Sequence, residues 1–308
     1  MRLAVFDGSY LLHRTLRVEG AGNLRAERVP TGGFFGVLQS VRAMLANNIR
    51  SQRAVLVLDG GVSRRRLDLF PMYKANRRGP EEELSPEEKD YRALYRQQAK
   101  LVQERLPEFG IRVLRLAGRE GDDVIGMLSV LWDGPCVVAT DDKDLLQLVS
   151  KRVSVYQPRK GVEVTPESWE DLIGFPGGAE RFLWYLAVVG DRSDNIQGVQ
   201  GVGEVTMKGL LAEYRGDDLN EFAEHCDAHQ RSLPRRVKLG IERVRSNLEL
   251  FDVLRERFDD PEIRQAMDLL SEPCFFDDRR ASATLRELRF KQILENYGRW
   301  AHPFRGLR

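Results

Sequence analysis

Two groups of acidic residues lie close together in the middle of the chain, between Gly118 and Asp144. The first group opens an apolar stretch with helical spacing, and the second directly follows a strand-like run at 136–139. In an open parallel sheet, the carboxyl ends of the strands and the first turns of the following helices share one crevice. We therefore expect both groups to face the same space. Their members are Glu120, Asp122 and Asp123 in the first group and Asp141, Asp142 and Asp144 in the second.

Acids at the start of a helix also have a plain structural explanation, because the free N–H groups and the helix dipole there favour negative charge. Two acidic groups in one crevice, however, would repel each other and raise each other's pKa values unless a cation neutralised them. Hard divalent ions prefer carboxylate oxygens as ligands. The pattern therefore predicts a site for Mg²⁺ or Mn²⁺.

Two further apolar runs end in an acidic residue. Residues 3–6 precede Asp7, and residues 54–58 precede Asp59. Both runs are typical of buried strands in a parallel sheet. Because these strands would end at the same edge as the strand at 136–139, Asp7 and Asp59 are predicted to join the crevice.

Strand-like and helical patterns alternate up to about residue 165, and helices dominate beyond it. The alternation indicates an α/β fold with a mostly parallel central sheet flanked by helices. We predict an α/β domain at 1–165 and a mainly helical region at 166–308. No apolar run is long enough to span a membrane. Three widely spaced cysteines predict free thiols in a reducing cytoplasm.

The composition turns basic between residues 64 and 78. Basic runs usually form a solvated surface. Here the side chains could also contact phosphates beside the crevice, with Tyr73 stacked on a base. The helical pattern that follows places Arg92 and Arg96 on one face.

Glycines occur at two places where the backbone could approach a phosphate. The pair at 32–33 either opens a helix or provides such an approach. The glycines at 198–203 separate two predicted helices within residues 181–214, as in a helix-hairpin-helix motif that touches DNA through backbone N–H groups, although an ordinary loop would look similar. Asp191 and Asp194 precede this turn and could cap the second helix or reach a second metal ion.

Taken together, these features resemble the 5′-nucleases, the family of flap endonucleases, bacteriophage 5′→3′ exonucleases and the 5′-nuclease domain of bacterial DNA polymerase I. The matching motifs occur in the family's order over about residues 1–215. They are Asp7 after the first strand, Thr31-Gly32-Gly33-Phe34, Leu58-Asp59-Gly60, Tyr73-Lys74-Ala75-Asn76-Arg77, Glu120-Gly121-Asp122-Asp123, Thr140-Asp141-Asp142-Lys143-Asp144 and Gly190-Asp191-Arg192-Ser193-Asp194-Asn195. The family usually has Ala at position 121 and Ala or Ser at position 141. Neither change removes a ligand.

The resemblance implies a PIN-like sheet, a helical arch near residues 74–105 and a helix-hairpin-helix turn at 190–204. It implies one metal site at Asp7, Asp59, Glu120 and Asp122, and a second at Asp123, Asp142, Asp144 and Asp194 with Asp191 nearby. The catalytic residues would be Lys74 and Arg77, which contact the scissile phosphate, together with Asp7 and Asp142. Residues expected to contact DNA are Tyr73, Lys74, Arg77, Arg92, Arg96, Gly198, Gly201, Gly203, Lys208, Arg235, Arg236 and Lys238. A K⁺ ion at the glycine turn is a further implication.

The implied function is a structure-specific 5′→3′ exonuclease or flap endonuclease in DNA replication or repair, working with two divalent ions. Its partner would be DNA with a 5′ flap, a nick or a 5′ end, and replication proteins could join it. A monomer in a bacterial or phage-infected cytoplasm is expected. Four scattered histidines offer no Ser/His/Asp arrangement, so water is the expected nucleophile. The alternatives are a PIN-type ribonuclease acting on RNA or an RNA–DNA hybrid, and a branched-DNA-binding protein without cleavage.

Overall fold

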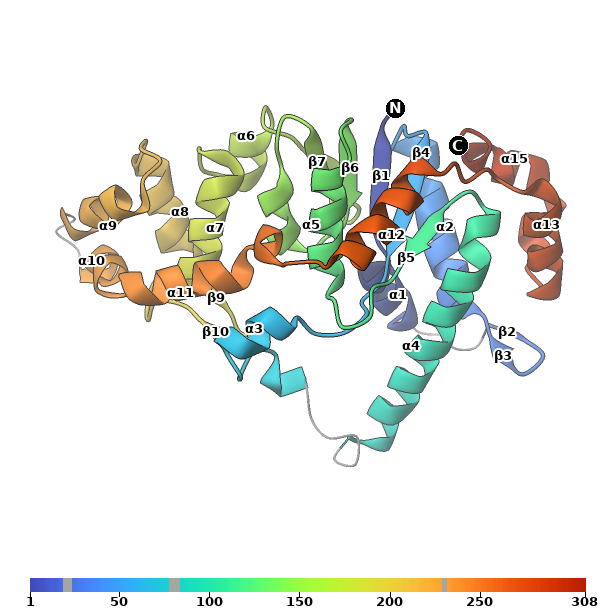
Figure 1. Ribbon diagram of the computed structural model, residues 1–308, viewed down its shortest axis with the longest axis horizontal. Helices are drawn as coiled ribbons and strands as arrows, with labels where there is room; N and C mark the ends of the chain where they lie inside the picture. Colours follow the sequence, from blue (N-terminus) through green and yellow to red (C-terminus); the bar gives the residue numbers. More distant parts are fainter. Residues whose placement is uncertain (19–23, 78–83, 229–231) are drawn as a thin grey trace.

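A six-stranded sheet runs through the middle of the molecule (Figure 1). The structure is a computed structural model that describes residues 1–18, 24–77, 84–228 and 232–308. In spatial order, the strands are β5 (Arg112–Leu114), β4 (Arg53–Val57), β1 (Leu3–Asp7), β6 (Cys136–Ala139), β7 (Val153–Gln157) and β8 (Val162–Val164). All neighbours pair in parallel except β7 and β8, which are antiparallel. The predicted fold class is confirmed, and the sheet is the mostly parallel type.

Strand β1 is central and apolar on both faces. Successive side chains of a strand point to opposite faces, so Leu3 and Val5 enter one core while Ala4 and Phe6 enter the other. The residues of β1 pair in register with β4 and β6. The carboxyl ends of all three strands therefore meet at one edge of the sheet, the lower edge in Figure 1.

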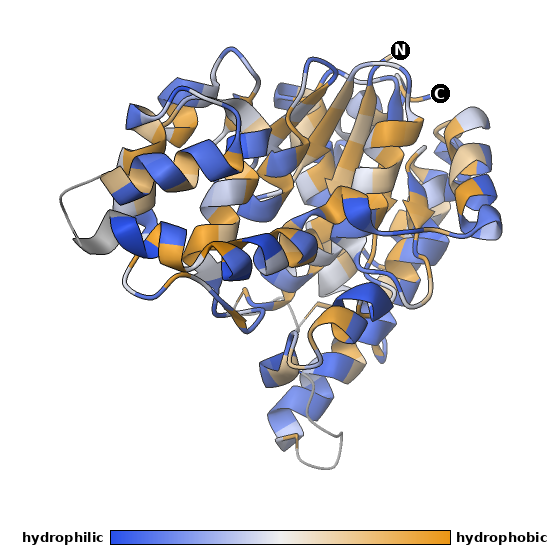
Figure 2. Ribbon diagram, turned by 60° about the vertical axis from the view of Figure 1, so that its left-hand side comes forward, coloured by the Kyte–Doolittle hydropathy of each residue, from blue (hydrophilic) through white to orange (hydrophobic). Residues whose placement is uncertain are grey.

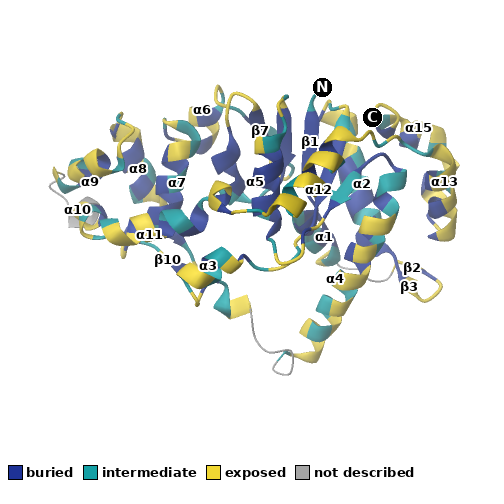
Figure 3. Cartoon of the chain, viewed as in Figure 1, coloured by how far each residue is buried: buried dark blue, intermediate teal, exposed yellow. Residues whose placement is uncertain are grey.

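Helices cover both faces of the sheet, and the apolar strands are buried between them (Figures 2 and 3). One core receives α5 (Gly121–Leu131), η5 (Lys143–Leu148), α6 (Trp169–Ile173), α7 (Gly178–Val189), α8 (Glu204–Glu213), α9 (Leu219–Ala228), α10 (Ser232–Leu239), α11 (Ile241–Phe251), η6 (Val253–Arg255) and α12 (Asp260–Ser271). The other core receives α1 (Gly8–Leu16), α2 (Gly32–Asn47), α4 (Pro86–Arg105), η4 (Leu106–Glu108), α13 (Asp278–Glu287), α14 (Lys291–Glu295), α15 (Tyr297–Ala301) and η7 (His302–Phe304). Smaller elements are β2 (Arg25–Ala26), β3 (Val29–Pro30), α3 (Arg64–Leu69), η2 (Ala75–Arg77), β9 (Gly190–Asp191) and β10 (Ile196–Gln197).

Helix α4 projects from the body of the molecule below the sheet in Figure 1. It begins at a capping box in which Ser85 and Glu88 each bond the other's backbone N–H, a strong helix-start signal. Its inner end packs on α2, where a Cβ at Gly33 would lie only 2.8 Å from Gln98. The glycine pair at 32–33 thus opens α2, and Gly33 allows close packing between α2 and α4. Residues 78–83 of the predicted arch lie outside the described residues.

The region after residue 165 is mainly helical, as its sequence predicts. It does not form one helical layer, however. Helix α11 packs along α7 on one side of the sheet, whereas Trp300 and Phe304 make edge-to-face contacts with Phe109 in the core on the other side. The division at residue 165 stays a prediction. No helix within the described ranges is long and apolar enough to span a bilayer.

Candidate metal centre and neighbouring cleft

Acidic residues gather at the carboxyl edge of the sheet. Asp7 is the last residue of β1, and Asp59 lies just beyond β4. Glu120 is the N-cap residue of α5, and Asp122 lies in the first turn of that helix. Asp7, Asp59 and Asp142 are each close enough to Asp122 to raise its pKa. The structure thus brings together the acids that were predicted for the first metal site and Asp142 from the second.

Hydrogen bonds from the backbone and from Thr140 hold the first of these carboxylates in place. Asp7 accepts from the backbone N–H of Tyr10 at 2.9 Å and from the Thr140 hydroxyl at 2.8 Å. Asp59 accepts from the N–H of Gly121 at 2.6 Å. A Cβ at Gly121 would lie only 2.8 Å from this carboxylate oxygen. Glycine therefore lets Asp59 approach the positive end of α5 closely.

Glu120 is buried and accepts three hydrogen bonds. The Lys74 Nζ atom donates at 2.6 Å, the Tyr73 hydroxyl at 2.9 Å and the backbone N–H of Ser63 at 2.9 Å. Burial alone would raise the pKa of Glu120, but the charges of Lys74 and Arg66 outweigh it and lower that pKa below its usual range. Glu120 is thus ionised, and the positive charges of Lys74 and Arg66 partly balance its negative charge.

The second acidic cluster lies between η5 and the loop after α7. Asp142 accepts a hydrogen bond from the backbone N–H of Asp144 at 2.9 Å. Asp194 pairs with Arg77 at 3.0 Å and lies 3.7 Å from the Lys74 Nζ atom. Asp191 accepts from the backbone N–H of Ser193 at 2.6 Å and is close enough to raise the pKa of Asp144. These residues were predicted for the second site, and they lie together.

The carboxylates of Asp7, Asp122 and Asp144 form no ion pair with a cation in the described part of the chain. Burial raises the pKa of Asp7 to about 7, and the nearby Asp59 and Asp142 push it in the same direction. The pKa values of Asp122 and Asp144 are also raised, by burial first and by Asp142 second. One oxygen of Asp144, Oδ1, is buried and makes no hydrogen bond within the described structure. Such a group is costly to leave without a partner.

The side chains as they stand do not form a closed ligand cage. In the described part of the chain, no three His, Cys, Asp or Glu residues converge tightly enough to hold a metal ion. The reason is visible in the contacts, because Glu120 and Asp194 are turned toward cations and Asp7 and Asp59 toward backbone N–H groups. The donor set is nevertheless made of carboxylate oxygens in a crevice with uncompensated charge. This chemistry fits hard divalent ions such as Mg²⁺.

Asp123 does not belong to the crevice, so its predicted role as a metal ligand needs correction. Its carboxylate is fully buried and pairs with Arg66 through two hydrogen bonds of 2.6 and 2.7 Å. Burial raises the pKa of Asp123 to about 6, although Arg66 opposes this shift. On α5, Asp122 and Asp123 are adjacent and therefore point in different directions. Only Asp122 faces the other acids.

Tyr73 needs a second correction, because it is buried and cannot stack on a base. Its ring lies under Lys74, with the Nζ atom 5.0 Å from the ring centre, and its hydroxyl reaches Glu120. Lys74 itself has a backbone φ of +52°, an uncommon conformation for a residue with a side chain. It lies between Glu120 and Asp194, and therefore between the two acidic clusters. Arg77 follows on η2 and is exposed.

Asp141 is also explained by the structure. Its carboxylate accepts hydrogen bonds from the Tyr10 hydroxyl and from the backbone N–H of Arg159. It therefore joins the loop after β7 to α1, while its neighbour Asp142 faces the crevice. The family resemblance gave Asp141 no ligand role, and these contacts show that its carboxylate has a structural one.

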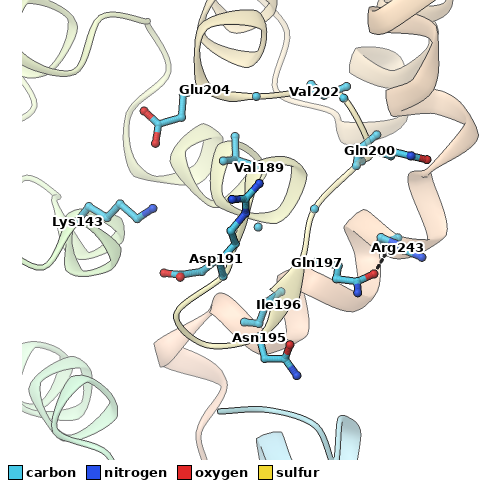
Figure 4. Close-up of a pocket in the computed structure, with 16 residues that line it drawn as sticks. Lys143, Val189, Asp191, Asn195, Ile196, Gln197, Gln200, Val202, Glu204 and Arg243 are labelled. Carbon is cyan, nitrogen blue, oxygen red and sulfur yellow. Dashed lines mark hydrogen bonds between the residues drawn. The ribbon is translucent and has the colours of Figure 1, made fainter. Parts of the chain in front are cut away.

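A cleft of about 1260 Å³ lies beside the second cluster, at the glycine turn between α7 and α8 (Figure 4). Lys143 lines one side and Arg243 of α11 the other, with the turn between them. Gly201 has a φ of +81°, which favours glycine. Gly198 has a different reason to be glycine, because a Cβ there would lie 2.2 Å from the carbonyl oxygen of Val189. Its small size is required by the contact with α7, and its predicted contact with DNA stays a prediction.

The other residues predicted to contact DNA are spread over three helices. Arg92 donates to the carbonyl of Arg77 at 3.2 Å, and Arg96 is exposed on the same helix, α4. Lys208 is partly buried on α8, and Gly203 is exposed at its start. On α10, Arg235 and Lys238 pair with acids of α9, while Arg236 donates to the carbonyl of Gln200 in the glycine turn at 3.1 Å. Of these three residues of α10, Arg236 is the one with a contact to the glycine turn.

Several residues of the site carried no clear signal in the sequence. Arg66 is one of three consecutive arginines, and only its depth in the structure sets it apart. Ser63 and Thr140 are short polar residues whose partners are distant in sequence. Lys143 is part of the motif at 140–144, but the sequence pattern predicts no role for it. Its position between two acids in the sequence, Asp142 and Asp144, was the available hint.

Comparison with known proteins places these observations in a family. Residues 2–174 match the family model described as 5′-3′ exonuclease, N-terminal resolvase-like domain. A 5′-3′ exonuclease of Bacillus subtilis (strain 168) is 31% identical over 270 residues, which cover 83% of this chain and 82% of that protein. The thermostable DNA polymerase I of Thermus filiformis is 30% identical over 313 residues, which cover 96% of this chain but 33% of the polymerase. The chain thus spans about a third of that relative's length.

Solved structures share the fold. The T5 D15 protein co-crystallised with metal ions has a TM-score of 0.64 at 20% identity, covering 93% of this chain and 99% of that chain. The catalytic core of Rad2 in complex with DNA substrate has a TM-score of 0.51 at 19% identity, covering 99% of this chain and 91% of that chain. The family model covers more than half of the chain, and the Bacillus subtilis relative aligns along most of both chains, so this chain belongs to the 5′-3′ exonuclease family.

Proposed function

We propose that this chain is a metal-dependent 5′-nuclease that hydrolyses DNA phosphodiester bonds at 5′ ends and 5′ flaps. The observation that supports this function best is the meeting of Asp7, Asp59, Asp122 and Asp142 at one edge of the sheet, in a member of the 5′-3′ exonuclease family. The acids come from three strand ends and one helix start. A purely structural role would not require so much like charge in one crevice.

Two divalent ions would be held by the two acidic clusters. The first site would use Asp7, Asp59, Glu120 and Asp122, and the second Asp142, Asp144, Asp191 and Asp194. When bound, such ions activate water and stabilise the charge on the leaving oxygen. Asp144 supports this assignment most directly, because its buried Oδ1 atom makes no hydrogen bond in the described structure.

Lys74 and Arg77 would bring positive charge to the scissile phosphate. Lys74 lies between the two clusters, within 2.6 Å of Glu120 and 3.7 Å of Asp194. A phosphate group that enters the crevice would offer this ammonium group a third anionic partner. The charge that develops on the phosphate during hydrolysis would then be stabilised by a group that is already in position.

The duplex would lie in the cleft at the glycine turn. This cleft is continuous with the second cluster through Asp191, and Lys143, Arg192 and Arg243 add positive charge to its walls. Backbone N–H groups of a glycine turn can approach a phosphate without side-chain interference. The T5 D15 flap endonuclease, a structural neighbour with a TM-score of 0.63 at 18% identity, has been crystallised as a complex with DNA and metal ions. These observations favour DNA as the substrate.

Cleavage of end-labelled nucleic acids tests this function. We expect 5′-flap and nicked DNA to be cut in Mg²⁺ or Mn²⁺ and to stay intact in EDTA. Asp142→Asn should abolish cutting and keep DNA binding, because only the metal-facing carboxylate changes. The matched control is Asp141→Asn, since that carboxylate faces Tyr10 and Arg159 instead. Cutting of RNA but not of branched DNA would indicate a PIN-type ribonuclease, and binding of flap DNA without any cutting would indicate a binding protein.

The finer predictions extend this function. Mg²⁺ is the expected ion in the cell, and K⁺ is expected at the glycine turn. The chain is expected to act as a monomer in the cytoplasm and to meet replication proteins at nicks and flaps. Comparing cleavage in K⁺ and Na⁺ buffers would check the K⁺ site, and sedimentation of the free protein would check whether it is a monomer.

A further inference from the structure

A short segment that includes the last residues of α11 contacts neighbours of both acidic clusters, although it lies outside residues 2–174 that match the family model. We call residues 250–256 the strap. The strap contacts α3, α5 and η5. A Cβ at Gly126 of α5 would lie 3.1 Å from Val253, so the strap packs directly on the helix that begins at Glu120.

Glu256 is the point where the strap meets the first cluster. Its side chain is only 2% exposed. One oxygen accepts from the Ser63 hydroxyl at 2.7 Å, and the Ser63 backbone N–H donates to Glu120 at 2.9 Å. The other oxygen accepts from the Arg119 guanidinium at 2.7 Å. Glu256 therefore holds both the residue that donates to Glu120 and the residue that precedes it.

Gln147 is the corresponding contact at the second cluster. Its side-chain N–H₂ group donates to the carbonyl of Phe251 in the strap at 3.0 Å and to the carbonyl of Asp144 at 2.7 Å. Its oxygen accepts from the backbone N–H of Val253 at 3.0 Å. The strap thus fixes η5 at the turn that carries Asp144.

Carboxylates that repel one another move apart unless other groups fix them. In metal sites, the partners of the ligands set ligand orientation, and their loss typically lowers metal affinity or activity by about 10–100-fold. The hydrogen bonds that Glu256 accepts meet this description. Ser63 links Glu256 to Glu120, and the Glu256 side chain is shielded from water.

We propose that Glu256 is a positioning residue that holds Glu120 in place for metal binding, through Ser63 and Arg119. This inference rests on the proposed metal-dependent function. Glu256 itself would touch neither the metal nor the substrate.

The test compares three variants of the full chain. Glu256→Gln keeps the shape of the side chain and removes its charge, and Ser63→Ala removes the hydroxyl at the other end of the same link. Glu262→Gln is the matched control, because Glu262 also pairs with Arg119, at 2.7 Å, but does not contact Ser63. Binding of Mn²⁺ alone to the DNA-free protein is measured by electron paramagnetic resonance. Binding of flap DNA in EDTA and urea unfolding are measured in parallel.

We expect Glu256→Gln and Ser63→Ala each to weaken Mn²⁺ binding about tenfold, with DNA binding in EDTA unchanged. Glu262→Gln should bind Mn²⁺ like the wild type. The double variant should bind Mn²⁺ no more weakly than the weaker single variant, because both changes break one link. If Glu256→Gln fails to fold, Ser63→Ala decides the outcome. Mn²⁺ binding in Glu256→Gln equal to that in Glu262→Gln would overturn the positioning role, whereas a wild type that binds no Mn²⁺ would overturn the metal function itself.

Discussion

Replacing Asp123 with asparagine should destabilise the fold and leave metal binding intact. Asp123 and Arg66 form a pair that is almost fully buried, with side-chain exposures of 0% and 3%. Two hydrogen bonds of 2.6 and 2.7 Å join them. Asparagine would keep one acceptor oxygen but would turn an N–H₂ group toward the second guanidinium N–H. Arg66 would retain the carbonyl of Leu250, at 2.6 Å, and the more distant Glu120, at 3.7 Å.

The expected cost follows from leaving a buried charge without its main partner. Breaking a buried ion pair by removing one member costs about 3–5 kcal/mol. The remaining bond from Asn and the neighbouring Glu120 place the expected loss toward the lower end of that range. With an m value of about 3 kcal/mol/M in urea, the unfolding midpoint should fall by roughly 1 M.

Urea unfolding and Mg²⁺ titration together provide the assay, with Asp122→Asn as the matched control in the same turn of α5. Burial and Asp142 raise the pKa of Asp122, so removal of its charge should stabilise the metal-free protein and weaken Mg²⁺ binding. Asp123→Asn should instead lower the free energy of unfolding and leave Mg²⁺ binding unchanged. An Asp123→Asn protein with an unchanged urea midpoint and no Mg²⁺ binding would refute the reasoning and restore Asp123 as a ligand.

Three further changes have defined outcomes. Burial raises the pKa of Asp7 from its usual value to about 7, so the folded state binds this proton more tightly than the unfolded state, and in EDTA the free energy of unfolding should fall as pH rises from about 4 to 7. Asp7→Asn should make that slope smaller, with Asp122 and Asp144 supplying the remainder, and an equal slope in both proteins by urea unfolding would contradict the assignment. Lys74→Met should lower the single-turnover cleavage rate by about 10²–10³-fold, and a rate within twofold of wild type would exclude its role at the phosphate. Gly201→Ala should lower the free energy of unfolding by about 1–2 kcal/mol, because φ at Gly201 is +81°. Gly203→Ala should leave that free energy unchanged, because φ at Gly203 is −94°. Equal urea midpoints in the two variants would argue against strain at the turn.

The edge of the sheet could be predicted from the sequence because its pattern is local. Buried parallel strands appear as apolar runs, and an acid just after such a run lies at the carboxyl edge. The run at 136–139 coincides with β6. The acids Asp7, Asp59 and Asp142 could be assigned to one crevice in this way.

The partners of these acids could not be predicted, because they are set by contacts between distant segments. The arginines at 64–66 have the same local sequence but side-chain exposures of 84%, 20% and 3%. Helix α3 has only six residues, so its rotation about its own axis is set by packing on α11 and not by a hydrophobic pattern of its own. The buried hydroxyl of Tyr73 and the strap at 250–256 depend on the same long-range contacts.

The distribution of cations over the crevice separates the acids into two kinds. Glu120 and Asp194 each have protein cations within 4 Å, since Lys74 reaches both and Arg77 reaches Asp194. Asp7, Asp122 and Asp144 have raised pKa values and no such pair in the described structure. Divalent ions should therefore gain most from the second kind of acid, because binding there replaces repulsion with attraction. At Glu120 and Asp194 they would instead compete with ammonium and guanidinium groups. Lys74, which pairs with these two acids, would be the group that a bound phosphate draws away from them.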